Sequence, residues 1–308
     1  MVIRKNIEYN INKIIKEKIN EKIIINFFYN IKKRIKKKIT NIKNIIAISS
    51  GKGGVGKSTF SSNISMVMSK MGFKVGLFDA DIYGPSIPLI FNLKKINNIK
   101  LNNNKIIPIE KYGVKIISLG FFLKKNQSVL WKGPIAIKYL NKLIKETDWG
   151  FLDFLIIDFP PGTSDIHIFI SSEFYINGTV VISTPQILSL SDVYRNISMF
   201  SNNFIKIPII GIVENMSYFF NNEKKHYLFG KKTVKNFTEK LKLYYLGSIP
   251  IIENIRLFSD KGINIEKDIY SYNIYKKITI KIIKKILNVN KNLSKSEINN
   301  ILNKIKNK

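Results

Sequence analysis

The sequence predicts an α/β fold in which a doubly wound, mostly parallel sheet is flanked by helices. Short, nearly all-apolar runs recur from Asn44 onward, as expected for strands that are buried on both faces. Segments with helical spacing alternate with these runs. A glycine-rich pattern also stands between the first apolar run and the first helical segment. In such a sheet, ligands bind at the carboxyl ends of the strands.

The expected elements follow one another along most of the chain. The expected strands are residues 44–49, 74–79, 115–119, 154–158, 179–183, 208–214 and 245–249. The expected helices are residues 58–70, 134–146, 189–202, 231–241 and 272–287. No internal repeat interrupts this alternation.

The glycine-rich segment satisfies the pattern G-x-x-x-x-G-K-[ST]. Its glycines let several backbone N–H groups point at phosphate oxygens, and the following helix adds its positive end. We expect Lys57 to reach the β- and γ-phosphates of ATP, and the Ser58 hydroxyl to bind Mg²⁺. The strand before it and the helix after it disfavour a glycine-rich turn that binds nothing. The predicted nucleotide-binding residues of the loop are Gly51, Lys52, Gly53, Gly54, Val55, Gly56, Lys57, Ser58 and Thr59.

Two acidic residues follow the second expected strand. Phosphoryl transfer needs a carboxylate near the γ-phosphate to orient water and to steady Mg²⁺. Asp79 and Asp81 are two residues apart, so on an extended chain their side chains point the same way. We assign Asp81 to positioning the attacking water, and Asp79 to supporting Mg²⁺ or the loop. A capped turn at a strand end is the structural alternative.

A third carboxylate, Asp158, ends the apolar strand 154–158 and is followed by Pro160, Pro161 and Gly162. This is the Walker B arrangement, so Asp158 is expected to hold the metal, usually through its water. By analogy with a switch loop, Gly162 is expected to donate its N–H to the γ-phosphate. Asp165 either caps the following helix or relays the switch.

The loop holds a second lysine, Lys52. The run Gly-Lys-Gly-Gly-Val-Gly-Lys-Ser resembles the deviant Walker A form of the nitrogenase iron protein, the Min and Par partition ATPases and the Mrp/ApbC carriers. The resemblance implies a homodimer in which Lys52 reaches the partner's nucleotide and neutralises charge during phosphoryl transfer. A solvated loop lysine is the alternative. The expected catalytic residues are thus Lys52, Lys57 and Asp81.

Further segments resemble the Mrp/ApbC iron–sulfur carrier family in particular, over roughly Asn44 to Ile265. The resemblance implies that Asn215 bonds the adenine edge, although a loop-stabilising bond also suits a buried amide. It also implies iron–sulfur assembly or acceptor proteins as partners. The matching segments are Asp79–Pro88, Trp131–Pro134, Asp158–Asp165, Ser183–Gln186, Gly211–Ser217, Leu246–Pro250, Ile255–Arg256 and Ser259–Gly262.

The resemblance ends where that family usually carries a Cys-x-x-Cys pair. The corresponding stretch here, Tyr218 to His226, has no cysteine, and the 308 residues contain none. Thiolates hold nearly all iron–sulfur clusters, so a cluster is implied by family resemblance alone and direct ligation is not expected. His226 and Glu223 are the remaining candidate ligands, but one histidine among lysines is typical of a surface residue. His167, inside a helical pattern, is expected to be structural.

The composition is strongly basic, with 51 Lys and Arg against 21 Asp and Glu, a net charge of +30. Lysine is spread along the chain together with Asn and Ile, which favours compositional drift over a selected phosphate-binding face. We therefore expect no specific nucleic-acid partner. No apolar run reaches the roughly 20 residues of a membrane span. The N-terminus lacks the features of a signal peptide, so a cytoplasmic location is expected.

The chain divides into three parts by composition. Residues 1–43 form a basic, low-complexity N-terminal extension, in which Ile7 to Ile19 have the spacing of an amphipathic helix and residues 23–28 suit a short strand. That helix is expected to pack on the main domain or to be partly disordered, and the alternative is a helix that lies on a membrane surface. Residues 44–287 form the P-loop ATPase domain. Residues 288–308 form a polar C-terminal tail, expected to be a loose helix or unstructured.

The leading functional hypothesis is an ATP-binding and ATP-hydrolysing protein of the Mrp type, with Mg²⁺, that acts in iron–sulfur cluster assembly or transfer. Two alternatives remain open. One is a positioning ATPase that binds membrane or nucleoid when loaded with ATP. The other is a non-enzymatic, ATP-bound scaffold for another assembly factor.

Overall fold

The computed structural model describes residues 36–93, 101–102, 105–122, 133–290 and 293–306. Contacts divide the chain into Met1–Arg34 and Ile35–Lys308, and the description concerns the second unit. The amphipathic helix and the short strand expected in the N-terminal extension lie outside the described residues.

The main sheet has eight strands in the order β12-β9-β8-β1-β7-β2-β6-β5. Neighbouring strands pair in parallel, except that β5 runs antiparallel to β6. The predicted doubly wound, mostly parallel sheet is therefore confirmed. The strands are β1 (Ile42–Ser50), β2 (Val75–Asp79), β5 (Ile109–Lys111), β6 (Val114–Ser118), β7 (Leu152–Asp158), β8 (Gly178–Ser183), β9 (Ile209–Asn215) and β12 (Tyr245–Ile249).

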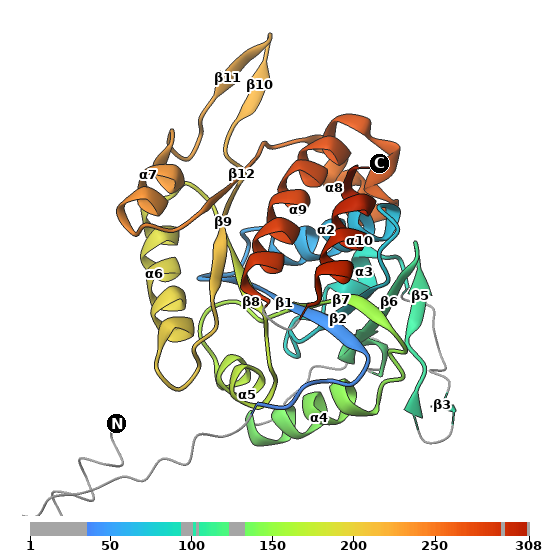
Figure 1. Cartoon of the computed structure of the whole chain (residues 1–308). Coiled ribbons are helices and arrows are strands. Elements are labelled where there is room, and N and C mark those ends of the chain that lie inside the picture. Colours follow the sequence, from blue (N-terminus) through green and yellow to red (C-terminus); the bar gives the residue numbers. More distant parts are fainter. Residues whose placement is uncertain (1–35, 94–100, 103–104, 123–132, 291–292, 307–308) are drawn as a thin grey trace, which may run out of the picture. The chain divides into compact units, whose positions relative to one another are not determined.

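Helices cover both faces of this sheet (Figure 1). α2 and α9 pack against one face, and α4, α5, α6 and α7 pack against the other. None of the helices within the described ranges is long and apolar enough to cross a bilayer. The helices are α2 (Lys57–Lys70), α3 (Ile87–Ile90), α4 (Gly133–Glu146), α5 (Asp165–Glu173), α6 (Ile187–Ser201), α7 (Thr233–Lys240), α8 (Glu253–Lys261), α9 (Ile269–Val289) and α10 (Lys295–Lys306), with 3₁₀ turns at Leu119–Phe121 and Ile265–Lys267.

The apolar runs become strands because both of their faces are covered. Every residue of β2, β7 and β8 is buried, and so are the last seven residues of β1. Alternate residues along β1 serve opposite faces: Ile46 and Ile48 belong to the core under α2 and α9, whereas Ile45 and Ala47 belong to the core over α4 and α5. Such strands carry no polar face, which is why they read as continuous apolar runs.

Two small hairpins lie outside the main sheet. β3 (Leu101–Asn102) pairs with β4 (Lys105–Ile106), and β10 (Phe219–Asn221) pairs with β11 (Lys224–His226). The β10–β11 hairpin projects beyond the helices (Figure 1). Asn222 and Glu223 turn it with left-handed φ angles of 45° and 64°.

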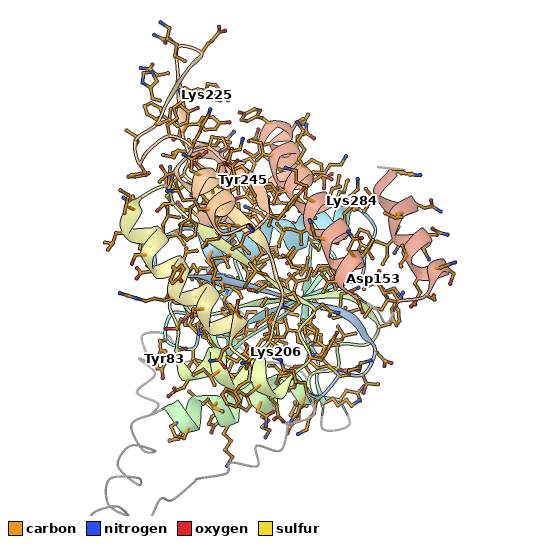
Figure 2. The ribbon with its side chains drawn as sticks, turned by 60° about the vertical axis from the view of Figure 1, so that its left-hand side comes forward. Tyr83, Asp153, Lys206, Lys225, Tyr245 and Lys284 are labelled. Carbon is orange, nitrogen blue, oxygen red and sulfur yellow. The ribbon has the colours of Figure 1, made fainter. Side chains whose placement is uncertain are left out.

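Residues 295–306 of the C-terminal tail, for which the sequence predicts a loose helix or an unstructured segment, form the packed helix α10. Ile301 of α10 is buried in the core that α2 and α9 share. Lys304 forms an ion pair with the nearly buried Asp153 carboxylate at 3.2 Å, and Figure 2 shows Asp153 beside this helix. Ile298, Ile301 and Leu302 recur at helical spacing, so the tail has the apolar stripe that a surface helix needs.

Candidate nucleotide-binding site

The loop between β1 and α2 borders a cavity of about 600 Å³. Gly54 and Gly56 have φ angles of 77° and 82°, which side chains with a Cβ rarely adopt. Gly51 is needed for a different reason, because a Cβ there would lie 2.5 Å from the backbone carbon of Asp192 in α6. The cavity is lined by Ser50, Lys52, Gly53, Gly54, Val55, Gly56, Lys57, Ser58, Thr59, Asp81, Ser86, Leu89, Ile90, Pro161, Ser259 and Asp260.

The Lys57 side chain is held at the base of this loop by an acid of the neighbouring strand. Its Nζ lies 2.9 Å from Oδ2 of Asp158, and both side chains are nearly or wholly buried. The Ser58 hydroxyl donates to the same carboxylate oxygen at 2.6 Å, and Ser61 donates to the other oxygen at 2.6 Å. Lysine, serine and the Walker B aspartate therefore form one hydrogen-bonded group, and their predicted contacts with phosphate and Mg²⁺ stay predictions.

Asp79 lies beside Asp158, since the two residues are register partners in the pairing of β2 with β7. The Asp79 carboxylate accepts hydrogen bonds from the Ser118 hydroxyl at 2.9 Å and from the Asp81 N–H at 3.1 Å. Burial, together with the nearby negative charge of Asp158, raises the pKa of Asp79 to about 8. Asp79 is therefore mostly protonated at neutral pH, and a bound cation would favour its ionised form.

Asp81 points to the cavity rather than into the protein. It lines the cavity, and its Oδ1 accepts the Gly84 N–H at 3.1 Å. Burial raises the pKa of this carboxyl above its usual value. Asp79 itself is buried and is not one of the lining residues, so the structure separates the two carboxylates that the sequence places on one side.

Lys52 is directed toward the start of α6. Its Nζ donates to Oε1 of Gln186 at 2.8 Å. Gln186 directly precedes α6, and its side chain makes no capping bond to that helix. Lys52 also lines the cavity, whereas Gln186 is not among the lining residues.

Gly162 and Asn215 brace the loop in this structure. The Gly162 N–H donates to the Ser50 carbonyl at 2.9 Å, and the Asn215 Nδ2 donates to the Val55 carbonyl at 2.8 Å. The predicted contacts of Gly162 with the γ-phosphate and of Asn215 with adenine stay predictions. The first requires that the Gly162–Ser50 bond opens.

The stretch that stands in place of a cysteine pair is the aromatic and basic β10–β11 hairpin. Lys225 Nζ lies 4.5 Å from the ring centre of Tyr218, and the Tyr218 and Phe220 rings meet edge to face at 5.4 Å. On the other side of the ribbon, Phe219 stacks on His226 at 5.2 Å. Figure 2 shows Lys225 on this projecting ribbon. In the described part of the chain, no group of three or more His, Asp or Glu side chains could hold a metal ion on its own.

Several residues that contribute to the site were not identified by the sequence motifs. Ser61 has a detectable signal, because it follows Ser58 by three residues on one helix face. Ser118 carries no such signal. Ser259 and Asp260 of α8 lie in a segment that resembles the family, but no site role was predicted for them, and they line the cavity. His167 is buried and structural: its Nδ1 accepts the Ser164 N–H at 3.1 Å in a capping box at the start of α5.

A glycine-rich loop between a central parallel strand and a helix, with its lysine paired to the acid that ends the next strand, defines a P-loop NTPase. Residues 41–287 match the model of the NUBPL iron-transfer P-loop NTPase family, described as ParA-type. The chain belongs to this family.

Two relatives and two solved structures illustrate the likeness. An iron–sulfur cluster carrier protein of Aquifex aeolicus is 45% identical over 227 residues, which are 73% of this chain and only 62% of that protein. The iron–sulfur cluster transfer protein NUBPL of Dictyostelium discoideum is 42% identical over 273 residues, 86% of this chain and 84% of that one.

A nucleotide-binding protein of Archaeoglobus fulgidus in complex with ADP superposes with a TM-score of 0.66 at 32% identity, covering 77% of this chain and 93% of that chain. The septum site-determining protein MinD of Pyrococcus horikoshii, complexed with Mg-ADP, has a TM-score of 0.56 at 20% identity, covering 81% and 99%, and shares the fold.

Proposed function

We propose that this chain binds and hydrolyses ATP with Mg²⁺ and uses the cycle in iron–sulfur cluster assembly or transfer, while other proteins hold the cluster. The observation that carries the ATP part is the hydrogen-bonded group of Lys57, Ser58 and Asp158 beside a glycine-rich loop whose residues line the cavity. This group pairs a cation for phosphate with hard oxygen ligands for a metal.

The side chains present suit Mg²⁺ when it arrives with a nucleotide. Magnesium binds one or two protein oxygens and completes its shell with phosphate oxygens and water. The Ser58 hydroxyl and the Asp158 carboxylate supply such oxygens 2.6 Å apart, and Asp79 supports them from the next strand. Mg²⁺ would supply positive charge against the phosphates, and Lys57 would share that charge.

The catalytic roles in this proposal belong to side chains that line the cavity. Asp81 would orient the attacking water, because it lines the cavity beside the phosphate loop and Asp79 does not. Lys52 would approach the phosphates either in its own chain or across a homodimer, as its resemblance to deviant Walker A lysines implies. A mixture of Lys52→Ala and Lys57→Ala chains tests the dimer, since activity that reappears on mixing requires two copies in one site.

The cluster part of the proposal rests on the family and on its named relatives, which are iron–sulfur carrier and transfer proteins. These 308 residues contain no cysteine, and the β10–β11 hairpin offers Lys225, His226 and aromatic rings instead. Because thiolates hold nearly all protein-bound clusters, we place the cluster on partner assembly or acceptor proteins. A cytoplasmic location is part of the proposal and is checked by cell fractionation.

The test combines ATP turnover with iron content on the purified chain. We expect phosphate release from ATP that needs Mg²⁺ and disappears in Lys57→Ala and Asp81→Asn. We also expect no bound iron after incubation with iron and sulfide. Iron at one cluster per chain or per dimer would overturn the absence of ligation. Failure of calorimetry to detect ATP–Mg²⁺ binding would overturn the ATP part.

A further inference from the structure

The contact between Lys52 and Gln186 joins the phosphate loop to α6 through a neutral group. The Gln186 side-chain carbonyl accepts from Lys52 Nζ at 2.8 Å and from the Thr184 hydroxyl at 3.4 Å. Two donors on one oxygen fix the orientation of that amide. The nearby acid on α6, Asp192, is taken by Arg195 at 3.0 Å.

The choice of glutamine has a chemical consequence. An ammonium has three donor hydrogens, and one carbonyl uses one of them. The other two stay available to phosphate oxygens, and the positive charge of Lys52 is not neutralised by the group that holds it. A glutamate at position 186 would hold Lys52 more strongly, because charge-assisted hydrogen bonds are about twice as strong as neutral ones, but it would cancel that charge.

α6 is a suitable anchor because it is fastened to the loop and to the segment after β7. Asn196, which is fully buried, accepts from the Ser49 hydroxyl at 2.9 Å and donates to the Gly162 carbonyl at 3.0 Å. Gly51 lies directly against the backbone of Asp192. The start of α6 therefore keeps a fixed position relative to the loop that carries Lys52.

We propose that Gln186 is a positioning residue for Lys52: its neutral carbonyl holds the ammonium at the start of α6, beside the phosphate loop, and leaves its charge for the phosphates of a bound nucleotide. This inference rests on the proposed ATPase function. The inference gives Gln186 a specific role that no sequence motif assigns to it.

The experiment compares Gln186→Glu, Gln186→Ala and Lys52→Ala in ATP turnover and in the affinity for a non-hydrolysable ATP analogue with Mg²⁺. We expect Gln186→Glu to lower turnover to within about threefold of Lys52→Ala at low salt, with partial recovery at higher ionic strength as the new ion pair is screened. We expect Gln186→Ala to cost about two- to tenfold, the range of one net hydrogen bond. Analogue affinity should fall in the same order.

Two controls separate positioning from a structural role. Ser198→Glu adds the same charge to an exposed position of α6, about 18 Å further along the helix, and should leave turnover unchanged. In a Lys52→Ala background, the two Gln186 substitutions should have no further effect, because they act through that lysine.

Three results would overturn the inference. ATP turnover of Gln186→Glu could equal that of the wild type, or its reduced turnover could be independent of ionic strength. The Gln186 substitutions could also lower turnover further in the Lys52→Ala background. These outcomes differ from failure of the ATPase proposal, in which the wild-type chain itself shows neither analogue binding nor turnover.

Discussion

The Lys57 ammonium and the Asp158 carboxylate form an ion pair at 2.9 Å, and both side chains are almost inaccessible to water. In such a pair, removal of one partner strands the other charge, which costs about 3–5 kcal/mol of stability. We therefore expect Lys57→Met to lower the free energy of unfolding by about that amount. The double variant Lys57→Met with Asp158→Asn should recover more than half of the loss without recovering ATP binding.

Urea denaturation and calorimetry with ATP–Mg²⁺ measure the two effects of the Lys57 variants separately. Lys235→Met is the matched control, because its pair with Glu239 is exposed and 3.9 Å long, so we expect a change within about 0.5 kcal/mol. A double variant no more stable than Lys57→Met would show that the charge pair is not the source of the loss.

His167 offers a test by pH. Burial, together with the positive charge of Lys57, lowers the pKa of His167 to about 3, against 6.5 for the free side chain. Between these values the unfolded chain binds the proton and the folded chain does not, so stability falls as pH falls, by roughly 1.4 kcal/mol per pH unit. Above pH 6.5 the contribution is fully present.

We expect His167→Gln to flatten this dependence, since glutamine can accept the Ser164 N–H and cannot titrate. Chemical denaturation at pH 4.5 and pH 7.5 measures the difference. The variant's loss of stability between the two pH values should be smaller than that of the wild type. Equal losses in both proteins would assign the acid sensitivity to other groups.

At the scale of elements, the close contact between the phosphate loop and α6 depends on the absence of a Cβ at Gly51. A Cβ at Gly51 would lie 2.5 Å from backbone atoms of Asp192, whereas a Cβ at Gly53 would find its nearest neighbour, Pro161, at 3.9 Å. We expect Gly51→Ala to destabilise the protein by about 1–3 kcal/mol through overpacking. Gly53→Ala, the control in the same loop, should cost less than about 1 kcal/mol. Thermal unfolding of both variants checks this, and equal losses would contradict the close-approach argument.

Elements with a local signal could be predicted, and those without one could not. The seven expected strands form within about two residues of their predicted limits, because burial on both faces leaves continuous apolar runs. α8 was not predicted: it is short, none of its residues is fully buried, and only Ile255 and Phe258 pack against the core. The β10–β11 hairpin turns at Asn222 and Glu223 without the glycine that usually marks such turns.

The candidate site shows the same division. Asp158 was found because it ends a buried strand, and the loop residues were found because glycine spacing is itself the signal. The partnership of Lys52 with Gln186 joins residues 134 positions apart, and no local pattern records such a contact. Asp79 and Asp81 were expected to point the same way, but the chain leaves the strand after Asp79, and the period-two rule ends there.

For the molecule as a whole, nucleotide binding should raise the stability of the folded state. A ligand that binds the folded state alone adds about 2.7 kcal/mol when present at 100 times its Kd. We expect ATP with Mg²⁺ to raise the melting temperature, and EDTA or the Lys57→Met substitution to abolish the rise. The shift in a thermal scan checks this. A rise that survives in the Lys57→Met variant would place the nucleotide elsewhere.

The projecting β10–β11 hairpin is a suitable place for replacement by a loop from another protein. Its strands hydrogen-bond to each other and form a sheet of their own, so the eight-stranded sheet does not depend on their sequence. A thiolate-bearing loop from a relative named as an iron–sulfur cluster carrier could be grafted between Tyr218 and Tyr227 while the candidate nucleotide-binding site stays unchanged. Such a chimera would show whether this chain can transfer an iron–sulfur cluster that is bound to the chain itself.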